Sequence, residues 1–411
     1  MPVGVEWCVL ALMLSVQLTR IRFAVAGVHL LLEHIVLFAS VAVFVLRAPK
    51  LLFRRPAVYE SLLVAWASWN ALVSIREAPD VQASLRIVAW IVLALLILWF
   101  MRGFGRAYPR RFQKLLDASI AFGAALGFVY FLLWVCALAG LFSIGVQHEF
   151  VTGTVAMHGL ASEANLLGSQ LMCLVFLEVR RAVVHDVPVV PWRIAGLLLG
   201  IVSTMTRAAW LGTGLVIVGC VLARRFGRQP VATATRASTR SRALLLATCL
   251  VPLVVIIATP ARQKFSELVD VHSATGQGRV QQWDKAVADL REHDAYVSGL
   301  GTNSFAQRHE SPDLPGHSDY LPILPLVVVY DSGFVGAVLL GTGLVVVAFR
   351  DRRRCQRLTA FVFLAAFLVV GSATNPIWFG FIWLTVAAID PDVDVDFNPG
   401  ARAKKRTTGS R

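Results

Sequence analysis

Two arginines in this sequence have surroundings that suit anion binding. Arg207 interrupts an otherwise apolar run that extends from Ile194 to Ala223, and Arg279 stands in the glycine-bearing stretch "TGQGRVQQW". A guanidinium group donates hydrogen bonds in pairs and stays charged, which suits phosphate. Glycines just before a predicted helix also free backbone amides for an anion. Each arginine has a plainer interpretation: Arg207 as a helix-end residue whose charge reaches water, and Arg279 as an ordinary loop residue.

A histidine and a carboxylate in the same half of the chain are candidates for proton chemistry. His317 lies in "LPGHSDYLPIL", just before a long apolar segment, and a histidine at a membrane boundary can act as a base near neutral pH. A loop histidine without a role is the alternative. Glu163 and Asn165, in "MHGLASEANLLGSQL", fall near the end of another apolar segment. A carboxylate at that depth needs a partner or a cavity, and we expect Arg207 or Arg279 to be the partner.

The acidic run "DVDVD" at 392–396 resembles the aspartate repeat with which metal-dependent glycosyltransferases hold a divalent cation. It follows the last apolar segment and falls on the side opposite the candidates above, so we expect an acidic tail rather than a metal site. The six cysteines include no close pair, which argues against a disulfide framework and a thiolate metal site. We therefore expect neither a metal nor a cofactor.

The composition predicts the kind of protein that must position these residues. Of 411 residues, 57% are hydrophobic and only 16% are charged. Many apolar stretches have membrane-spanning length, whereas a β-barrel would show short alternating segments. The formal net charge is +14, and its arginines stand in short blocks between apolar stretches. That pattern fits the cytoplasmic loops of a membrane protein and anionic lipid headgroups, so we expect membrane lipids and no nucleic acid as partners.

The predicted fold is an all-α polytopic membrane protein with about 12 transmembrane helices in a single transmembrane domain over 1–411. The predicted spans are 4–19, 23–46, 57–76, 84–101, 118–143, 157–179, 191–205, 207–223, 243–259, 323–348, 358–373 and 376–389. The two segments that flank Arg207 are together too long for one span, so the chain must turn near this arginine.

The arginine-rich loops predict the orientation of the bundle. Each one follows an even-numbered span, so all fall on one side, which the arginine bias identifies as cytoplasmic. These loops are 47–55, 102–114, 180–193, 224–242 and 350–357. Both termini then lie in the cytoplasm, including the tail 390–411. The exception is "RIR" at 20–22, which this count places outside: either the first span is misdrawn or the bias tolerates it.

One long segment, 260–322, falls on the outer side between the ninth and tenth spans. It contains nine acidic and six basic residues, in agreement with an outer, periplasmic placement. The stretch "GRVQQWDKAVADLREH" within it predicts an amphipathic helix. The residues expected on its apolar face are Val280, Trp283, Ala286, Val287 and Leu290. A long loop beside a membrane is where binding and catalytic residues are expected.

The order of these motifs resembles a known family. "GLASEAN" and "TMTRAAWLG" precede the outer loop, which contains "GQGRVQQWDKAV" and "GLGTNSF" and closes with "GHSDYLPILPLVVVYDSGFVGAVLLG". This set resembles the O-antigen ligase and Wzy-type polymerase superfamily of bacterial envelope polysaccharide enzymes. The resemblance covers roughly residues 155–345. Many members have His-Asn where this chain has His317 followed by Ser318, so no role is carried over to Ser318.

The resemblance implies a GT-C-like bundle with one long periplasmic loop in the bacterial inner membrane. It implies an inverting, metal-independent glycosyltransferase that moves an oligo- or polysaccharide from undecaprenyl diphosphate to a lipid-anchored or glycan acceptor. By that resemblance Arg207 and Arg279 bind the diphosphate and His317 is the base, while Glu163 and Asn165 support the arginines. Such a site would face the periplasm.

Three other functions remain open at the level of sequence. A Wzy-type repeat-unit polymerase shares every motif with a ligase. A transporter of lipid-linked glycans would have polar residues near the middle of the membrane, and Glu33 and His34 in the second predicted span hint at that. A non-catalytic membrane scaffold would leave the set of arginines and histidine unexplained.

Overall fold

The computed structural model describes residues 3–25, 28–148, 155–227, 274–310, 318–350, 353–390 and 392–393. Within these ranges the chain forms fourteen α-helices, one 3₁₀ helix and two small hairpins, which confirms the all-α prediction. The helices are α1 (Val3–Ser15), α2 (Leu32–Arg47), α3 (Pro49–Leu52), α4 (Val58–Glu77), α5 (Val81–Ala107), α6 (Pro109–Leu138), α7 (Ala164–His185), α8 (Pro191–Ser203), α9 (Arg207–Gly227), α12 (Ala274–Glu292), α13 (Ser304–Arg308), α14 (Leu324–Phe349), α15 (Arg354–Gly371), η1 (Pro376–Trp378) and α16 (Gly380–Ile389). The strands are β1 (Arg22–Val25), β2 (Val28–Leu31), β3 (Val146–His148) and β4 (Val155–Met157), each pair antiparallel.

The number of long apolar helices is smaller than predicted. In the described residues five helices are long and apolar enough to cross a membrane: α5, α6, α9, α14 and α15. Three more apolar helices, within α1, α8 and α16, are shorter. These findings indicate a multi-pass membrane protein, but the prediction of about twelve spans is wrong for the described chain.

Length and charge explain the difference. An α-helix rises 1.5 Å per residue, so α8 with 13 residues and α16 with 10 are too short to cross about 30 Å of hydrocarbon. Helix α7 is long enough but carries Glu178, Arg180 and Arg181 in its second half. The predicted span at 243–259 lies outside the described residues.

The predicted span 23–46 is also partly wrong, because its first third is a β-hairpin. Strands β1 and β2 pair in register, with Arg22 opposite Leu31 and Phe23 opposite Leu30. Only from Leu32 does the chain become helical. Residues 23–31 include three β-branched or aromatic residues and four alanines and leucines, so hydropathy alone does not distinguish the two conformations.

The turn expected near Arg207 is confirmed. Helix α8 ends at Ser203 and α9 begins at Arg207. Between them Met205 adopts a left-handed conformation with φ 53°, and the Thr204 hydroxyl donates back to the carbonyl of Ile201 at 2.7 Å. Because α7 and α9 pack against each other and both begin at this end, their N-termini face the same side.

The arginine-rich loops gather on one side of the bundle, as predicted. The Arg102 guanidinium, 2% exposed, bridges Glu60, Asp390 and Asp392, so the ends of α4, α5 and α16 meet around one cation. Arg350, after α14, also pairs with Asp392 at 2.9 Å. We call this side the basic side.

A second ion cluster extends the basic side to α6, α7 and α8. Asp117 accepts hydrogen bonds from Arg181 and Arg193, both at 2.6 Å. Arg224 at the end of α9 pairs with Asp186 after α7 at 2.9 Å. Ion pairs on this face thus link α4, α5, α14 and α16 in one cluster, α6, α7 and α8 in a second, and α7 with α9.

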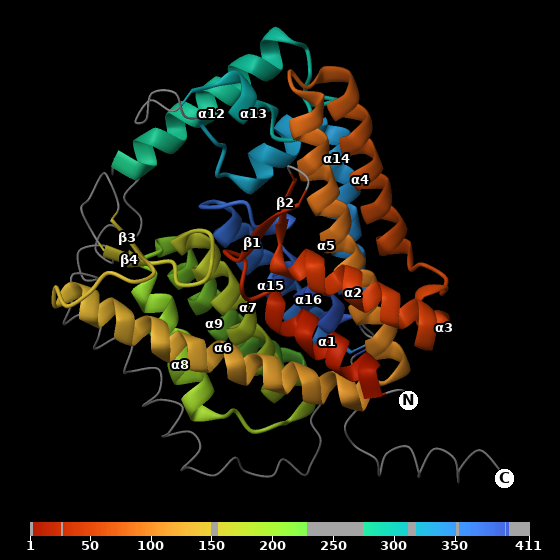
Figure 1. The fold of residues 1–411 in the computed structure, drawn as a ribbon, viewed down its shortest axis with the longest axis vertical. Helices are drawn as coiled ribbons and strands as arrows, with labels where there is room; N and C mark the ends of the chain where they lie inside the picture. Colours follow the sequence, from red (N-terminus) through yellow and green to blue (C-terminus); the bar gives the residue numbers. More distant parts are fainter. Residues whose placement is uncertain are drawn as a thin grey trace.

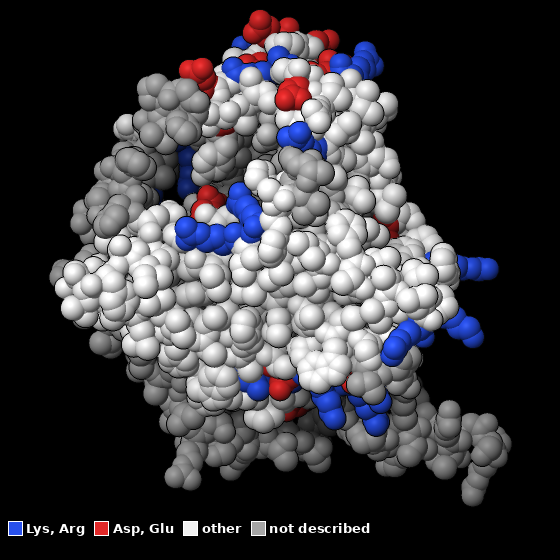
Figure 2. All heavy atoms as spheres, in the orientation of Figure 1, with Lys and Arg blue, Asp and Glu red and all other residues white. Residues whose placement is uncertain are grey.

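The opposite side carries α12, α13 and the two hairpins. Figure 1 shows α12 and α13 at one end of the molecule, beyond the ends of α4 and α14. The segment before α13 is tied to that end, because Thr302 N–H donates to Ser74 Oγ at 2.9 Å and Gln307 Nε2 donates to Ser84 Oγ at 2.9 Å. In Figure 2 charged side chains lie at the top, in a group left of centre in the upper half, and along the right and lower edges, with mainly uncharged surface between these groups.

The predicted amphipathic helix is confirmed as α12. Ala286 and Leu290 are buried on the rest of the protein, with Leu290 1% exposed. Val280 and Trp283, on the same predicted face but earlier in the helix, are about half exposed. Only the second half of α12 therefore packs on the bundle.

Candidate functional site

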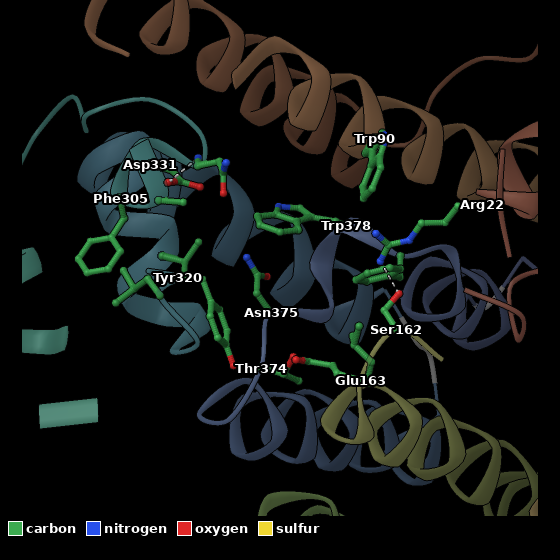
Figure 3. A pocket seen from close by; sticks show the side chains of 16 residues that line it. Arg22, Trp90, Ser162, Glu163, Phe305, Tyr320, Asp331, Thr374, Asn375 and Trp378 are labelled. Atoms are coloured by element: carbon green, nitrogen blue, oxygen red, sulfur yellow. Dashed lines mark hydrogen bonds between the residues drawn. The ribbon is translucent and has the colours of Figure 1, made fainter. Parts of the chain in front are cut away.

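A cavity of about 370 Å³ opens on the side opposite the basic side. Its lining comes from β1, α5, the segment before α7, α13, the segment 320–321, α14, and the stretch from Thr374 to Phe379. These elements are far apart in the sequence, and Figure 3 shows their side chains converging on one space. The described lining includes Glu163 but neither Arg207 nor Arg279.

Glu163 lies at the floor of this cavity, one residue before α7 begins. Its extended backbone (φ −152°, ψ 163°) ends the preceding loop. The hydroxyl of Thr374 donates to its Oε1. Burial raises the pKa of the Glu163 carboxyl above its ordinary value, while Thr374 and the charge of Arg279 act to lower it.

Arg279 lies in the second turn of α12, and its charge acts on the Glu163 carboxyl. Tyr320 lies within reach of both charges. Arg279 and Tyr320 are 41 positions apart in the chain, and Glu163 is more than a hundred positions from either. The fold therefore assembles a cation, a carboxyl group and a phenol at the cavity.

Arg207 is placed at the start of α9, beside the first turns of α7. A Cβ built on Gly168 would lie 2.6 Å from Ala209 Cβ and 3.3 Å from Thr204 Oγ1, so the α8–α9 turn packs directly on α7. Asn165, in the first turn of α7, accepts the Ser169 hydroxyl at its carbonyl. Two parallel helix N-termini at this end favour negative charge.

His317 lies outside the described residues, and its predicted role stays a prediction. The described chain on either side is held together, because Glu310 and Ser318 form an antiparallel bridge and Asp319 N–H donates to the carbonyl of His309 at 2.8 Å. Asp319 is fixed to α12, where Gln282 Nε2 donates to its Oδ1 at 2.9 Å.

Two arginines that the sequence reasoning left unassigned lie at this site. Arg22 lines the cavity, and its Nη2 donates to Ser162 Oγ at 2.9 Å. Arg20 Nη1 lies 2.8 and 2.7 Å from the two ring nitrogens of His158. Burial and the Arg20 charge lower the pKa of His158, so the neutral imidazole is favoured. In the sequence these two arginines form the stretch "RIR" at 20–22, the one basic stretch that departed from the arginine bias.

Asp331 is a further residue that the sequence reasoning missed. It lines the cavity from α14, where Gly333 (φ 64°, ψ −172°) breaks the helix. The break exposes backbone carbonyls, and Leu300 N–H and Gly301 N–H donate to the carbonyls of Tyr330 and Asp331 at 2.7 and 3.0 Å. The glycine in "YDSGFVG" was the signal for such an interruption.

The "DVDVD" run begins with an arginine-bound residue. Asp392 pairs with Arg102 and Arg350 on the basic side, and both arginines lower the pKa of its carboxyl although burial acts to raise it. Its remaining aspartates, Asp394 and Asp396, lie outside the described residues. Asp392 therefore links the C-terminal ends of α5 and α14 through these two arginines.

The chemistry available at the site combines two regions. At its rim, Arg279 and the N-termini of α7 and α9 can hold an anion. Inside, the cavity offers tryptophans, amides and carboxyl groups. No family model matches the chain, and no curated protein matches it.

Proposed function

We propose that this protein is a membrane glycosyltransferase of the O-antigen ligase and Wzy-type polymerase superfamily. It moves an oligo- or polysaccharide from undecaprenyl diphosphate to a lipid-anchored or glycan acceptor. In this proposal the chain is a GT-C-like multi-pass bundle in the bacterial inner membrane. The basic side and both termini face the cytoplasm, and the cavity faces the periplasm.

The observation that carries the proposal is the assembly of Arg279 and Glu163 at the N-terminus of α7, with Arg207 starting the neighbouring α9. All three lie on the side opposite the basic side, where a donor presented at the outer membrane surface would be met. The same three residues stand in the motifs that resemble the family.

In the proposed reaction the leaving group is the undecaprenyl diphosphate. Negative charge grows on its phosphate oxygens as the glycosidic bond breaks, and Arg207 and Arg279 stabilise that charge. His317 removes the proton of the acceptor hydroxyl, whose oxygen forms the new bond to the sugar. Glu163 and Asn165 orient the arginine side of the site.

Reconstituted protein with an undecaprenyl diphosphate-linked glycan donor and a glycan acceptor tests this proposal. We expect Arg279→Ala to lower the transfer rate by about 100-fold or more, the usual effect of removing one charge-stabilising group. Arg291→Ala is the matched control, because this arginine lies exposed at the end of the same helix. Equal rates for the two variants would refute the role of Arg279.

In cells, His317→Ala at normal expression should abolish full-length surface glycan, and its persistence would contradict the mechanism. The same strain separates the two subclasses. Long lipid-linked polymer accumulates when a ligase is lost, and single lipid-linked repeat units accumulate when a polymerase is lost.

A transporter of lipid-linked glycans is the second candidate, favoured by one observation. Glu33 and His34 are both fully buried in α2, and Glu33 Oε2 and His34 Nε2 have no hydrogen-bond partner among the described residues. Buried ionisable groups of this kind mark proton relays in transporters. Donor movement across a vesicle membrane without bond formation would support this candidate over the enzyme.

A further inference from the structure

The lining of the cavity differs in charge from its rim. Arg22 is the one cation in the described lining, and it faces two carboxyl groups, Glu163 and Asp331. A diphosphate inside this space would meet two carboxyl groups and a single cation, which already donates to Ser162. The cavity proper is therefore suited to a neutral ligand, in contrast to the anion-binding groups at the rim.

One buried donor in the lining has no partner. Asn375, 8% exposed, uses its Oδ1 to accept the N–H of Ile377, while its Nδ2 donates to no described atom. Such a group is expected to bind water or a ligand. Figure 3 shows Asn375 near the centre of the lining, between Asp331 and Thr374.

Asp331 supplies an acceptor across the same space. Its Oδ1 accepts the N–H of Asn303 at 3.2 Å, and its position just before the break at Gly333 holds it at the wall. An amide donor and a carboxyl acceptor that face one cavity match neighbouring hydroxyl groups, each of which donates and accepts.

Tryptophans complete the lining. Trp90 of α5 and Trp378 of η1 both line the cavity, and Trp90 is held edge-on by His34 at 5.8 Å between ring centroids. The face of an aromatic ring carries partial negative charge and attracts the partially positive C–H groups of an apolar surface. A pyranose ring has such C–H faces together with a rim of hydroxyls.

We propose that this cavity binds a neutral pyranose ring, with Asn375 and Asp331 bonding its hydroxyls and Trp90 and Trp378 packing on its faces. The inference rests on the proposed function in one respect: the ring belongs either to the transferred glycan or to its acceptor. The volume of about 370 Å³ lies within the range of small-ligand pockets, about 300–1,000 Å³.

The test is direct binding of methyl glycosides of glucose, galactose, mannose, rhamnose and N-acetylglucosamine to the full chain in lipid nanodiscs. Saturation-transfer NMR reports the bound sugar protons. Asn375→Asp removes the free donor and keeps the oxygen that accepts from Ile377, and Trp378→Leu removes one ring. We expect each change to weaken binding of the preferred glycoside at least tenfold.

Trp192→Leu is the matched control, because Trp192 is half-exposed at the start of α8, on the basic side. Thermal unfolding establishes that each variant is folded. Absence of saturable binding for every glycoside, or equal affinity in wild type, Asn375→Asp and Trp378→Leu, overturns the inference.

Inorganic pyrophosphate distinguishes failure of this inference from failure of the proposed function. We expect Arg279→Ala to lose pyrophosphate binding and keep glycoside binding, and Asn375→Asp to do the reverse. Glycoside binding without pyrophosphate binding or transfer would refute the proposed function alone. In the transfer assay, a rise in KM for the donor or for the acceptor in Asn375→Asp identifies which of the two supplies the ring.

Discussion

At the scale of single residues, Arg102 and Arg279 show two uses of a cation. Arg102 is enclosed by three carboxylates on the basic side and joins helix ends. Arg279 lies near the cavity, where its charge acts on the Glu163 carboxyl. The first arginine joins helix ends, and the second is placed beside a cavity.

Arg102→Ala should lower the free energy of unfolding by up to about 3–5 kcal/mol, because Glu60 and Asp390 would lose their shared buried cation and keep only Arg54 and Arg350, respectively. Thermal or denaturant unfolding in detergent measures the change. Arg76→Ala is the control: its pair with Glu77 is 81% exposed on the arginine side and should contribute almost nothing. Similar losses for both variants would contradict the structural role of the buried network.

Glu163 gives a prediction about pH. Burial raises the pKa of its carboxyl in the folded protein, so the folded state binds its proton more tightly than the unfolded chain does. Its contribution to stability is complete below the unfolded pKa, about 4.3, and is lost as the pH rises through the folded value. Relative to Glu163→Gln, the melting temperature of the wild type should therefore fall as the pH rises above about 4.3. If the melting temperatures of the two proteins changed with pH in parallel, the pKa of Glu163 would not be raised in the folded state.

The sequence motifs pointed to one residue of the cavity lining, Glu163, and not to the rest of the lining. Arg207 and Arg279 also stand in recognisable motifs, but neither belongs to the described lining. Asp331, Asn375 and Trp90 are not singled out by a motif, because they line the cavity only after distant helices have packed. Arg22 was visible in the sequence as an exception to the arginine bias, without any sign of what it would contact.

At the scale of elements, the break in α14 shapes the cavity. At the break Gly333 lies directly against the carbonyl of Val297, since a Cβ on Gly333 would lie 2.1 Å from that oxygen. The break lets the segment 296–301 pack against α14 and places Asp331 at the wall.

Gly333→Ala should destabilise the fold by about 2–5 kcal/mol, through a left-handed backbone and the clash with Val297. Gly341→Ala, two turns later in the same helix, meets no atom within 4 Å and should be neutral or stabilising by up to about 1 kcal/mol. Thermal unfolding of the two purified variants measures the contrast. A neutral Gly333→Ala would mean that α14 does not need its interruption.

Hydropathy predicted most of the helices of the described chain, with ends correct within several residues. It did not distinguish the β1–β2 hairpin from helix, because pairing between strands is decided by contacts and not by apolar content. It also overcounted spans, since short buried helices such as α8 and α16 are as apolar as a span but owe their burial to neighbouring helices.

At the scale of the whole molecule, the two-sided distribution of charge predicts accessibility. Val297 is 63% exposed on the cavity side, and Arg55 is exposed near α3 on the basic side. In a cysteine-free background, Val297→Cys should react with a membrane-impermeant thiol reagent in intact spheroplasts. Arg55→Cys should react only after the membrane is permeabilised. The reverse pattern would invert the proposed orientation.

The hairpin between α1 and α2 has a consequence for biosynthesis. Helix α1 has Glu6 near one end and Arg20 and Arg22 beyond the other, so by the arginine bias it would orient the wrong way if it entered the membrane alone. The basic stretch 47–55 after α2 supplies the opposing bias. In the proposed orientation we therefore expect the two helices to enter the membrane as a pair, joined by strands β1 and β2. The side of the membrane that Arg22 faces would then be fixed only after α2 has been synthesised.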